Sequence, residues 1–249
     1  MPAEFTYHSE SHLHGEVVVE NAFPDEYNSL VDMIASLELP LRAVEGFTEF
    51  GRPLKPKRQM RTIGGAKKPF LLPVDQAALN GSIKTYLRSS GWSSEPVAAG
   101  GLVAGAQPLR LKGDFARSRV FVEVEFGNSA SFYRDLFKFQ IASRARTGDV
   151  GVLIAATDRL ARYFDSGVTT FETATRAMPY MALGLQMPVW IIGIEPVSYG
   201  RLGERYTELW DLCSDNGLDC HAFDATVHPA EMAPLDQADE EEAVSVEDE

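Results

Sequence analysis

The sequence predicts an α/β domain in which a mixed β-sheet is flanked by helices. Two runs are almost continuously apolar, as in strands that are buried on both faces: 149–156 (DVGVLIAA) and 188–194 (PVWIIGI). Segments with apolar residues at helical spacing alternate with these runs, which is typical of helices that cover a sheet. A third apolar run, 120–126, has acids at alternate positions and carries the functional prediction.

In the first part of the chain, residues 16–20 (EVVVE) favour a short strand because valine is β-branched. Residues 24–39 and 74–90 have apolar residues at helical spacing, so we expect two helices, the second ended by Gly91. The segment between them, 51–73, contains too many prolines and glycines for regular structure throughout.

After the strand at 120–126 the helical pattern resumes and continues to about residue 144. Asn128 or Ser129 is suited to cap this helix. The buried strand 149–156 leads into a polar loop and then a helix over about 170–184. The strand 188–194 is followed by a helix over 203–213, so strands and helices alternate to the end of the pattern.

The size and charge of the chain predict one domain with a tail. With 249 residues and 45% apolar content, residues 1–235 are enough for a single substantial domain. The formal net charge is −13, but residues 236–249 contain eight acids and no base, and without them the charge is −5. Such a tail is typical of a disordered, solvating segment.

Residues 51–69 form a basic arm, with seven lysines and arginines between positions 52 and 68 and no acid. A loop of this density can contact the phosphates of a nucleic acid, and we expect Lys57, Arg58 and Arg61 to do so. The alternative is a loop whose charges serve only solubility.

The sequence also indicates where the protein works. No apolar run approaches the length of a membrane span, and the polar N-terminus does not resemble a signal peptide. The two cysteines, Cys213 and Cys220, are more typical of reduced thiols than of a disulfide. We therefore expect a cytoplasmic protein.

Acidic residues gather around the strand at 120–126. Glu123 and Glu125 are two residues apart, so their carboxylates leave the same face of the strand. Asp114 lies nine residues before Glu123, far enough for an earlier strand and a turn to bring it alongside. Carboxylates held together repel one another, and a divalent cation removes the repulsion; oxygen ligands favour Mg²⁺. The alternative is a solvated face of an edge strand.

The run 114–128 (DFARSRVFVEVEFGN) resembles the catalytic segment of BglII/BstYI-like type II restriction endonucleases, members of the PD-(D/E)xK nuclease superfamily. The resemblance implies the restriction-endonuclease fold and a catalytic site at Asp114, Glu123 and Glu125. It further implies Mg²⁺, for which Mn²⁺ can substitute, bound by Asp114, Glu123 and the backbone carbonyl of Val124. The superfamily usually has lysine two residues after the glutamate. Glu125 makes the site similar to the all-carboxylate, BamHI-like version, with no lysine there to offset charge.

The resemblance extends to the segment GWSSEP at 91–96. In the family, a tryptophan that closes a helix stands three residues before a polar residue of the active site. That position is Glu95 here, so we expect a fourth catalytic acid, to hold a second metal or to orient water. An exposed loop glutamate is the alternative.

The family also implies where DNA would bind. Asn128 and Ser129 directly follow the catalytic strand, and a second loop offers Arg159, Asp165, Ser166 and Gly167. Asparagine can read adenine and arginine can read guanine. Helix capping is the competing role for Asn128, and a helix start is the competing role for the second loop.

The resemblance implies a homodimer that cuts double-stranded DNA at a short palindromic site with a GATC core, and a companion DNA methyltransferase in the cell. Two other classes of protein stay open. One is a structure-specific repair nuclease of the same superfamily, and the other is a DNA-binding protein without catalysis.

Overall fold

The computed structural model describes residues 3–41, 48–49, 52–53, 58–63, 66–98, 111–127, 129–163, 167–181 and 184–215. The chain forms two compact units, one of residues Met1–Pro40 with Val74–Val197 and one of residues Leu41–Pro73 with Ser198–Glu249. The tail at 236–249 lies outside the described residues, so the tail and the single domain ending at 235 stay predictions.

The first unit is built on a six-stranded mixed sheet in the order β1-β10-β9-β8-β7-β6. Strands β8, β9 and β10 run parallel, and the outer pairs β1–β10, β8–β7 and β7–β6 are antiparallel. This arrangement confirms the predicted mixed sheet. The strands are β1 Phe5–His12, β6 Ser93–Ser94, β7 Phe115–Arg117, β8 Val120–Glu125, β9 Val150–Ala156 and β10 Val189–Pro196.

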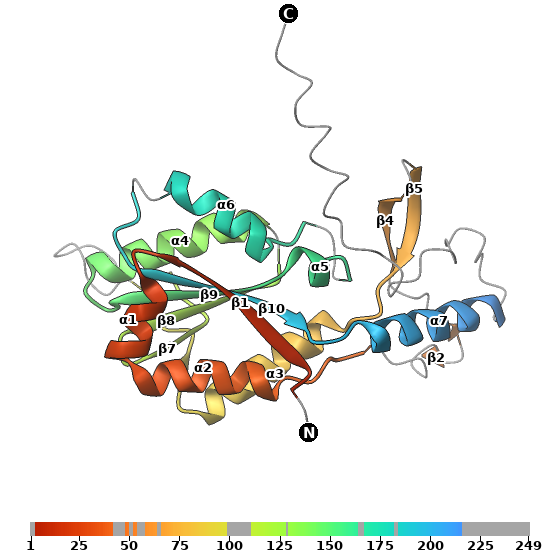
Figure 1. Ribbon diagram of the computed structural model, residues 1–249, viewed down its shortest axis with the longest axis horizontal. Coiled ribbons are helices and arrows are strands. Elements are labelled where there is room, and N and C mark those ends of the chain that lie inside the picture. Colours follow the sequence, from red (N-terminus) through yellow and green to blue (C-terminus); the bar gives the residue numbers. More distant parts are fainter. Residues whose placement is uncertain are drawn as a thin grey trace, which may run out of the picture. The chain divides into compact units, whose positions relative to one another are not determined.

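Helices cover both faces of this sheet (Figure 1). One face carries α1, α2 and α3, and the other carries α4 and α6, with the short α5 directly after β9. The bounds are α1 Gly15–Ala22, α2 Pro24–Ser36, α3 Gln76–Ser89, α4 Ser129–Arg144, α5 Asp158–Ala161 and α6 Phe171–Met181. The predicted helices in these regions are confirmed to within a few residues.

Two apolar layers hold the helices to the sheet. Under α4 and α6, Phe139 packs with Leu153 and Ile191 in one buried cluster. On the opposite face the ring of Trp190 stacks on Tyr27 of α2, with 5.1 Å between ring centroids. The central strands contribute to both layers, which explains why their sequences read as continuous apolar runs.

The predicted strand at 16–20 is wrong, because this segment lies within α1. Its buried positions, Gly15 and Val19, are four residues apart, whereas Val17 is 53% exposed. Packing of one helical face therefore overrides the β-branched preference of the valines. The strand of this region is β1, an edge strand whose alternating polar residues gave no apolar signal.

The second unit contains the basic arm. Strands β4 Arg58–Ile63 and β5 Ala66–Leu71 pair antiparallel, as do β2 Thr48–Glu49 and β3 Arg52–Pro53. The strand pair at 58–63 and 66–71 was not predicted from the sequence. Helix α7 Gly200–Asp215 belongs to the same unit. Within the described part of the chain, no helix is both long and apolar enough to cross a membrane.

Gly15 allows the start of α1 to lie against β10. A Cβ atom at this position would lie 2.1 Å from the backbone carbonyl carbon of Val189, which cannot move without shifting the strand. We expect Gly15→Ala to lower the free energy of unfolding by about 1–3 kcal/mol, measured by chemical denaturation. The matched control is Gly81→Ala in α3, which has open space around it and should stabilise the protein by about 0.5–1 kcal/mol. Equal effects of the two substitutions would contradict this packing.

Candidate active site

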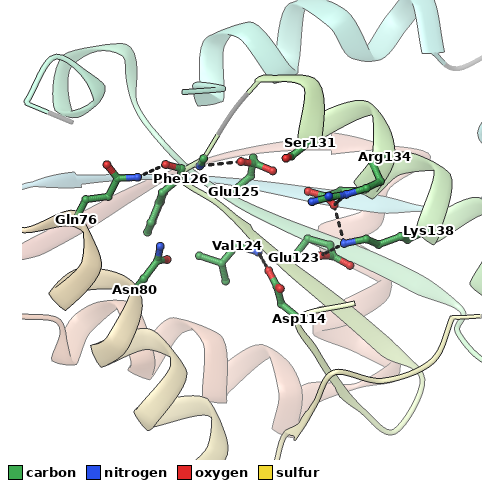
Figure 2. Close-up of a pocket in the computed structure, with 12 residues that line it drawn as sticks. Gln76, Asn80, Asp114, Glu123, Val124, Glu125, Phe126, Ser131, Arg134 and Lys138 are labelled. Atoms are coloured by element: carbon green, nitrogen blue, oxygen red, sulfur yellow. Dashed lines mark hydrogen bonds and ion pairs between the residues drawn. The ribbon is translucent and has the colours of Figure 1, made fainter. Parts of the chain in front are cut away.

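The β7–β8 hairpin brings the predicted acids together. Asp114 stands directly before β7, and its Oδ2 accepts a hydrogen bond of 2.9 Å from the backbone N–H of Val124. Glu123 and Glu125 leave the same face of β8, toward α4. All three acids line one cavity of about 260 Å³ (Figure 2). The register of a short hairpin thus places the acids as expected.

The two glutamates of β8 are buried, with 1% of Glu123 and 5% of Glu125 exposed. Burial, reinforced by the negative charge of Asp135, raises the pKa of Glu123 to about 8. Burial and a hydrogen bond with Asp135 likewise raise the pKa of Glu125 to about 8. Both shifts have the sign expected for acids that lack sufficient positive charge nearby.

Helix α4 supplies a buried acid and a buried base to the same cavity. The ammonium of Lys138 lies 2.8 Å from Glu123 Oε2 and 2.8 Å from Asp135 Oδ1. Burial alone would lower the pKa of Lys138, but its hydrogen bonds to Asp135 and Glu123 outweigh burial and raise it. The charge of the cavity therefore comes from α4 as well as from β8. The sequence analysis did not predict Asp135 or Lys138 as site residues.

Helix α3 forms another part of the cavity wall. Gln76 donates a side-chain hydrogen bond to the backbone carbonyl of Phe126, and Asn80 lies one turn along the helix. A second cavity of about 320 Å³ shares Asn80, Asp114 and Val124 with the first and extends to Lys84. Sequence reasoning missed Gln76 and Asn80, and polar side chains at helical spacing were the available signal.

A family model described as restriction endonuclease BglII/BglIII matches residues 7–194, which is most of the chain and includes the sheet and the hairpin with its acids. The chain belongs to the BglII/BglIII restriction endonuclease family. It is therefore a type II restriction endonuclease by family. No curated protein sequence matches it significantly.

A solved structure of BglII bound to DNA shares the fold of this chain. The structure titled "Crystal structure of restriction endonuclease BGLII complexed with DNA 16-mer" is 14% identical, with a TM-score of 0.52, over 76% of this chain and 75% of that one. "Crystal structure of free BglII" is also 14% identical, with a TM-score of 0.46, over 76% of this chain and 78% of that one. The first likeness confirms the predicted restriction-endonuclease fold.

In this BglII/BglIII family member, the Glu95 carboxylate does not join the other acids. Its side chain is 66% exposed and pairs with Lys112 at 2.7 Å, which lowers the pKa of Glu95. The backbone N–H of Glu95 donates a hydrogen bond to the backbone carbonyl of Asp114. The main chain of Glu95 therefore contacts a site residue, whereas its carboxylate does not join the other acids. The structure thus shows the exposed arrangement that was the alternative for this residue.

The expected DNA-contacting residues follow the ends of parallel strands. Ser129 begins α4 after β8, and Arg159 lies in α5 after β9. Gly167, with φ of +81°, stands in the turn before α6. These loops leave the carboxyl ends of neighbouring parallel strands, the edge where open α/β sheets bind ligands. The side chains of the other expected contacts, and of Ser129, lie outside the described residues: Asn128, Asp165, Ser166, Lys57, Arg58 and Arg61.

Two features decide whether these residues fit a metal ion. Among the described residues, no three Asp, Glu, His or Cys side chains are placed to hold one ion together. The expected set needs only two carboxylates, Asp114 and Glu123, plus the Val124 carbonyl. Glu123 Oε1 is buried and has no hydrogen-bond partner in the described part of the chain. A hard cation would satisfy this oxygen, so the residues present fit an oxygen-bound divalent ion.

The raised pKa of Glu123 predicts a pH dependence of stability in metal-free buffer. Between pH 5 and 8 the unfolded chain has lost the proton that folded Glu123 keeps, so the free energy of unfolding should fall as the pH rises. We expect Glu123→Gln to raise the melting temperature at pH 8 by about 2–4 °C, equivalent to about 1 kcal/mol in a chain of this size, and to change little at pH 5.

Differential scanning calorimetry in a metal chelator measures this effect. Glu20→Gln, which changes an exposed glutamate of α1, is the matched control and should give the wild-type profile. A Glu123→Gln protein that loses stability in parallel with the wild type as the pH rises would contradict the assignment.

Proposed function

We propose that this restriction endonuclease hydrolyses double-stranded DNA at a short palindromic site with a GATC core, using Mg²⁺, for which Mn²⁺ can substitute. The observation that carries the proposal is the hairpin geometry: Asp114, Glu123 and the Val124 backbone meet at one cavity, and a buried oxygen of Glu123 is left for a cation. The fold relative solved with a DNA 16-mer supports DNA as the substrate. A companion methyltransferase would protect the same site in the cell.

In the proposed mechanism Asp114, Glu123 and the Val124 carbonyl hold the metal ion. When bound, the ion lowers the pKa of a water molecule and offsets charge that develops on the phosphate. The N–H of Val124 fixes Asp114, and Lys138 contacts Glu123, so both carboxylates are oriented by the protein.

Glu125 is the residue we assign to orient or deprotonate the attacking water. One of its oxygens accepts a 2.8 Å hydrogen bond from the Gly127 N–H, which fixes the carboxylate. Burial raises its pKa to about 8, and a base works best with a pKa near the working pH. Glu95 would have to leave Lys112 to take part, so Glu125 is the better placed base.

DNA recognition would come from the loops at the same edge of the sheet. We assign base contacts to residues after β8 and to the loop between β9 and α6. The basic arm of the second unit would contact phosphates, with no sequence preference of its own. The residues assigned to bases are Asn128, Ser129, Arg159, Asp165, Ser166 and Gly167, and those assigned to phosphates are Lys57, Arg58 and Arg61.

We expect Asp114→Asn and Glu123→Gln each to abolish plasmid cleavage in Mg²⁺, because each removes a charged ligand while preserving the size of the side chain. Affinity for DNA in Ca²⁺, measured by fluorescence anisotropy, should stay within about threefold of wild type, since phosphate contacts dominate binding. Asp149→Asn is the control, because Asp149 pairs with Arg119 and does not line the cavity. Full cleavage by either site variant would remove that residue from the mechanism.

The cleavage products of a defined plasmid distinguish the classes of function. Discrete fragments whose sequenced ends share one palindrome support the proposal, and GATC at the centre supports the core. Smears or nicks at irregular structures would instead indicate a repair nuclease. Sequence-specific binding without cutting in Mg²⁺ or Mn²⁺ would indicate a non-catalytic DNA-binding protein.

A palindromic site is matched by a twofold-symmetric protein, so we propose a homodimer. Exposed aromatic side chains on α4 and α6 offer a surface for it, on the face of the sheet that both helices cover (Figure 1). Tyr133 and Phe137 lie one helical turn apart on α4 and are 54% and 55% exposed, and Tyr180 of α6 is 83% exposed. Aromatic residues are enriched in protein interfaces.

Light scattering after size exclusion tests the dimer. We expect the wild type at twice the chain mass of 27.4 kDa and the double variant Tyr133→Glu, Phe137→Glu as a monomer, because charge is costly in an apolar interface. Val17→Glu changes an exposed apolar residue of α1, on the other face of the sheet, and should leave the dimer intact. A double variant that stays dimeric would exclude this surface.

A further inference from the structure

Lys138 reaches the acids from α4 rather than from the catalytic strand. The strand position two residues after Glu123 is Glu125, so the strand itself provides no positive charge there. We propose that Lys138, anchored by Asp135, is a positioning residue of the hydrolytic site: it binds one oxygen of Glu123 and leaves the other facing the position of the cation. This inference rests on the proposed function and adds residues of α4 to it.

Three buried side chains form a continuous chain of contacts. Asp135 Oδ1 lies 2.8 Å from the Lys138 ammonium, which lies 2.8 Å from Glu123 Oε2. The exposed fractions of these side chains are 3%, 7% and 1%. Figure 2 shows Lys138 extending from α4 to Glu123, while Asp114 enters from the segment before β7. Water therefore competes little for these contacts.

The two oxygens of Glu123 are used differently. Oε2 is bound by Lys138, whereas Oε1 is buried and has no hydrogen-bond partner among the described residues. A Cβ atom at Gly113 would lie 2.8 Å from Oε1, so this oxygen faces the segment that carries Asp114, the next residue. The unbonded oxygen therefore lies beside the backbone that leads into Asp114, whose negative charge also acts on Glu123.

Asp135 connects both glutamates of β8. It holds Lys138 from three residues away on the same helix, and it hydrogen-bonds Glu125. Buried ion pairs contribute little to stability compared with apolar side chains of similar size, because desolvation offsets their attraction. Orientation of a metal ligand is a role that apolar side chains cannot fill, and partners of this kind commonly fix metal-binding carboxylates.

The test compares Lys138→Met, Lys138→Arg and the wild type by Mn²⁺ binding and by DNA cleavage. We expect Lys138→Met to bind Mn²⁺ about 10–100-fold more weakly in electron paramagnetic resonance titrations without DNA. Its single-turnover cleavage rate at saturating Mg²⁺ should fall by a similar factor. Lys138→Arg should recover most of both, because a guanidinium can also bridge two carboxylates. Arg119→Met breaks an ion pair that does not line the cavity and should change neither.

Thermal unfolding of each variant separates positioning from stability. A folded Lys138→Met protein with Mn²⁺ affinity equal to or tighter than wild type would overturn the proposal, since Lys138 would then be a structural partner or a competitor of the ion. If Lys138→Met does not fold, Asp135→Asn replaces it, with the same weakened Mn²⁺ binding expected and unchanged affinity overturning the proposal.

Failure of the nuclease proposal gives a different result. A wild type that binds Mn²⁺ but cuts no DNA, together with weakened Mn²⁺ binding by Lys138→Met, would support positioning at a metal site and reject the proposed hydrolysis. A wild type that binds no Mn²⁺ would overturn the positioning role itself.

Discussion

Glu123, Glu125 and Asp135 are buried beside Lys138 in one cavity, and this concentration of acids is the constraint on which the rest of the site depends. Three buried carboxylates cannot all be ionised beside one ammonium without a large electrostatic cost. The raised pKa values of Glu123 and Glu125 express that cost. A divalent cation, as in the proposed function, would relieve that cost.

The fold accommodates this charge by fixing each acid from a different element. The β7–β8 hairpin aligns Asp114 with the N–H of Val124, and the turn after β8 turns the N–H of Gly127 toward Glu125. Parallel pairing of β8 with β9 buries the strand, so the acids are desolvated by the same packing that stabilises the sheet. Burial of β8 therefore both stabilises the sheet and raises the pKa values of Glu123 and Glu125.

The sequence predicted the elements with strong periodicity and missed those defined by long-range contacts. Apolar runs located β9 and β10, and the β-branched and aromatic residues of 120–126 located β8. Strand β1 could not be predicted because it is stabilised by pairing with β10 rather than by apolar residues of its own. The position of the Glu95 side chain could not be predicted either, because its ion pair with Lys112 depends on the pairing of β6 with β7.

Lys138 shows why a strand motif alone describes such a site incompletely. On α4 an apolar stripe at Phe132, Leu136 and Phe139 runs beside a polar stripe at Ser131, Asp135 and Lys138 with similar spacing. The apolar stripe alone is enough to predict the helix. The sequence analysis therefore assigned no role to the polar stripe. Because α4 directly follows β8 and packs back on it, the ammonium of Lys138 reaches Glu123, although β8 itself contains no lysine or arginine. The attraction between the ammonium and the buried acids depends on the distance between them and not on where the lysine stands in the sequence.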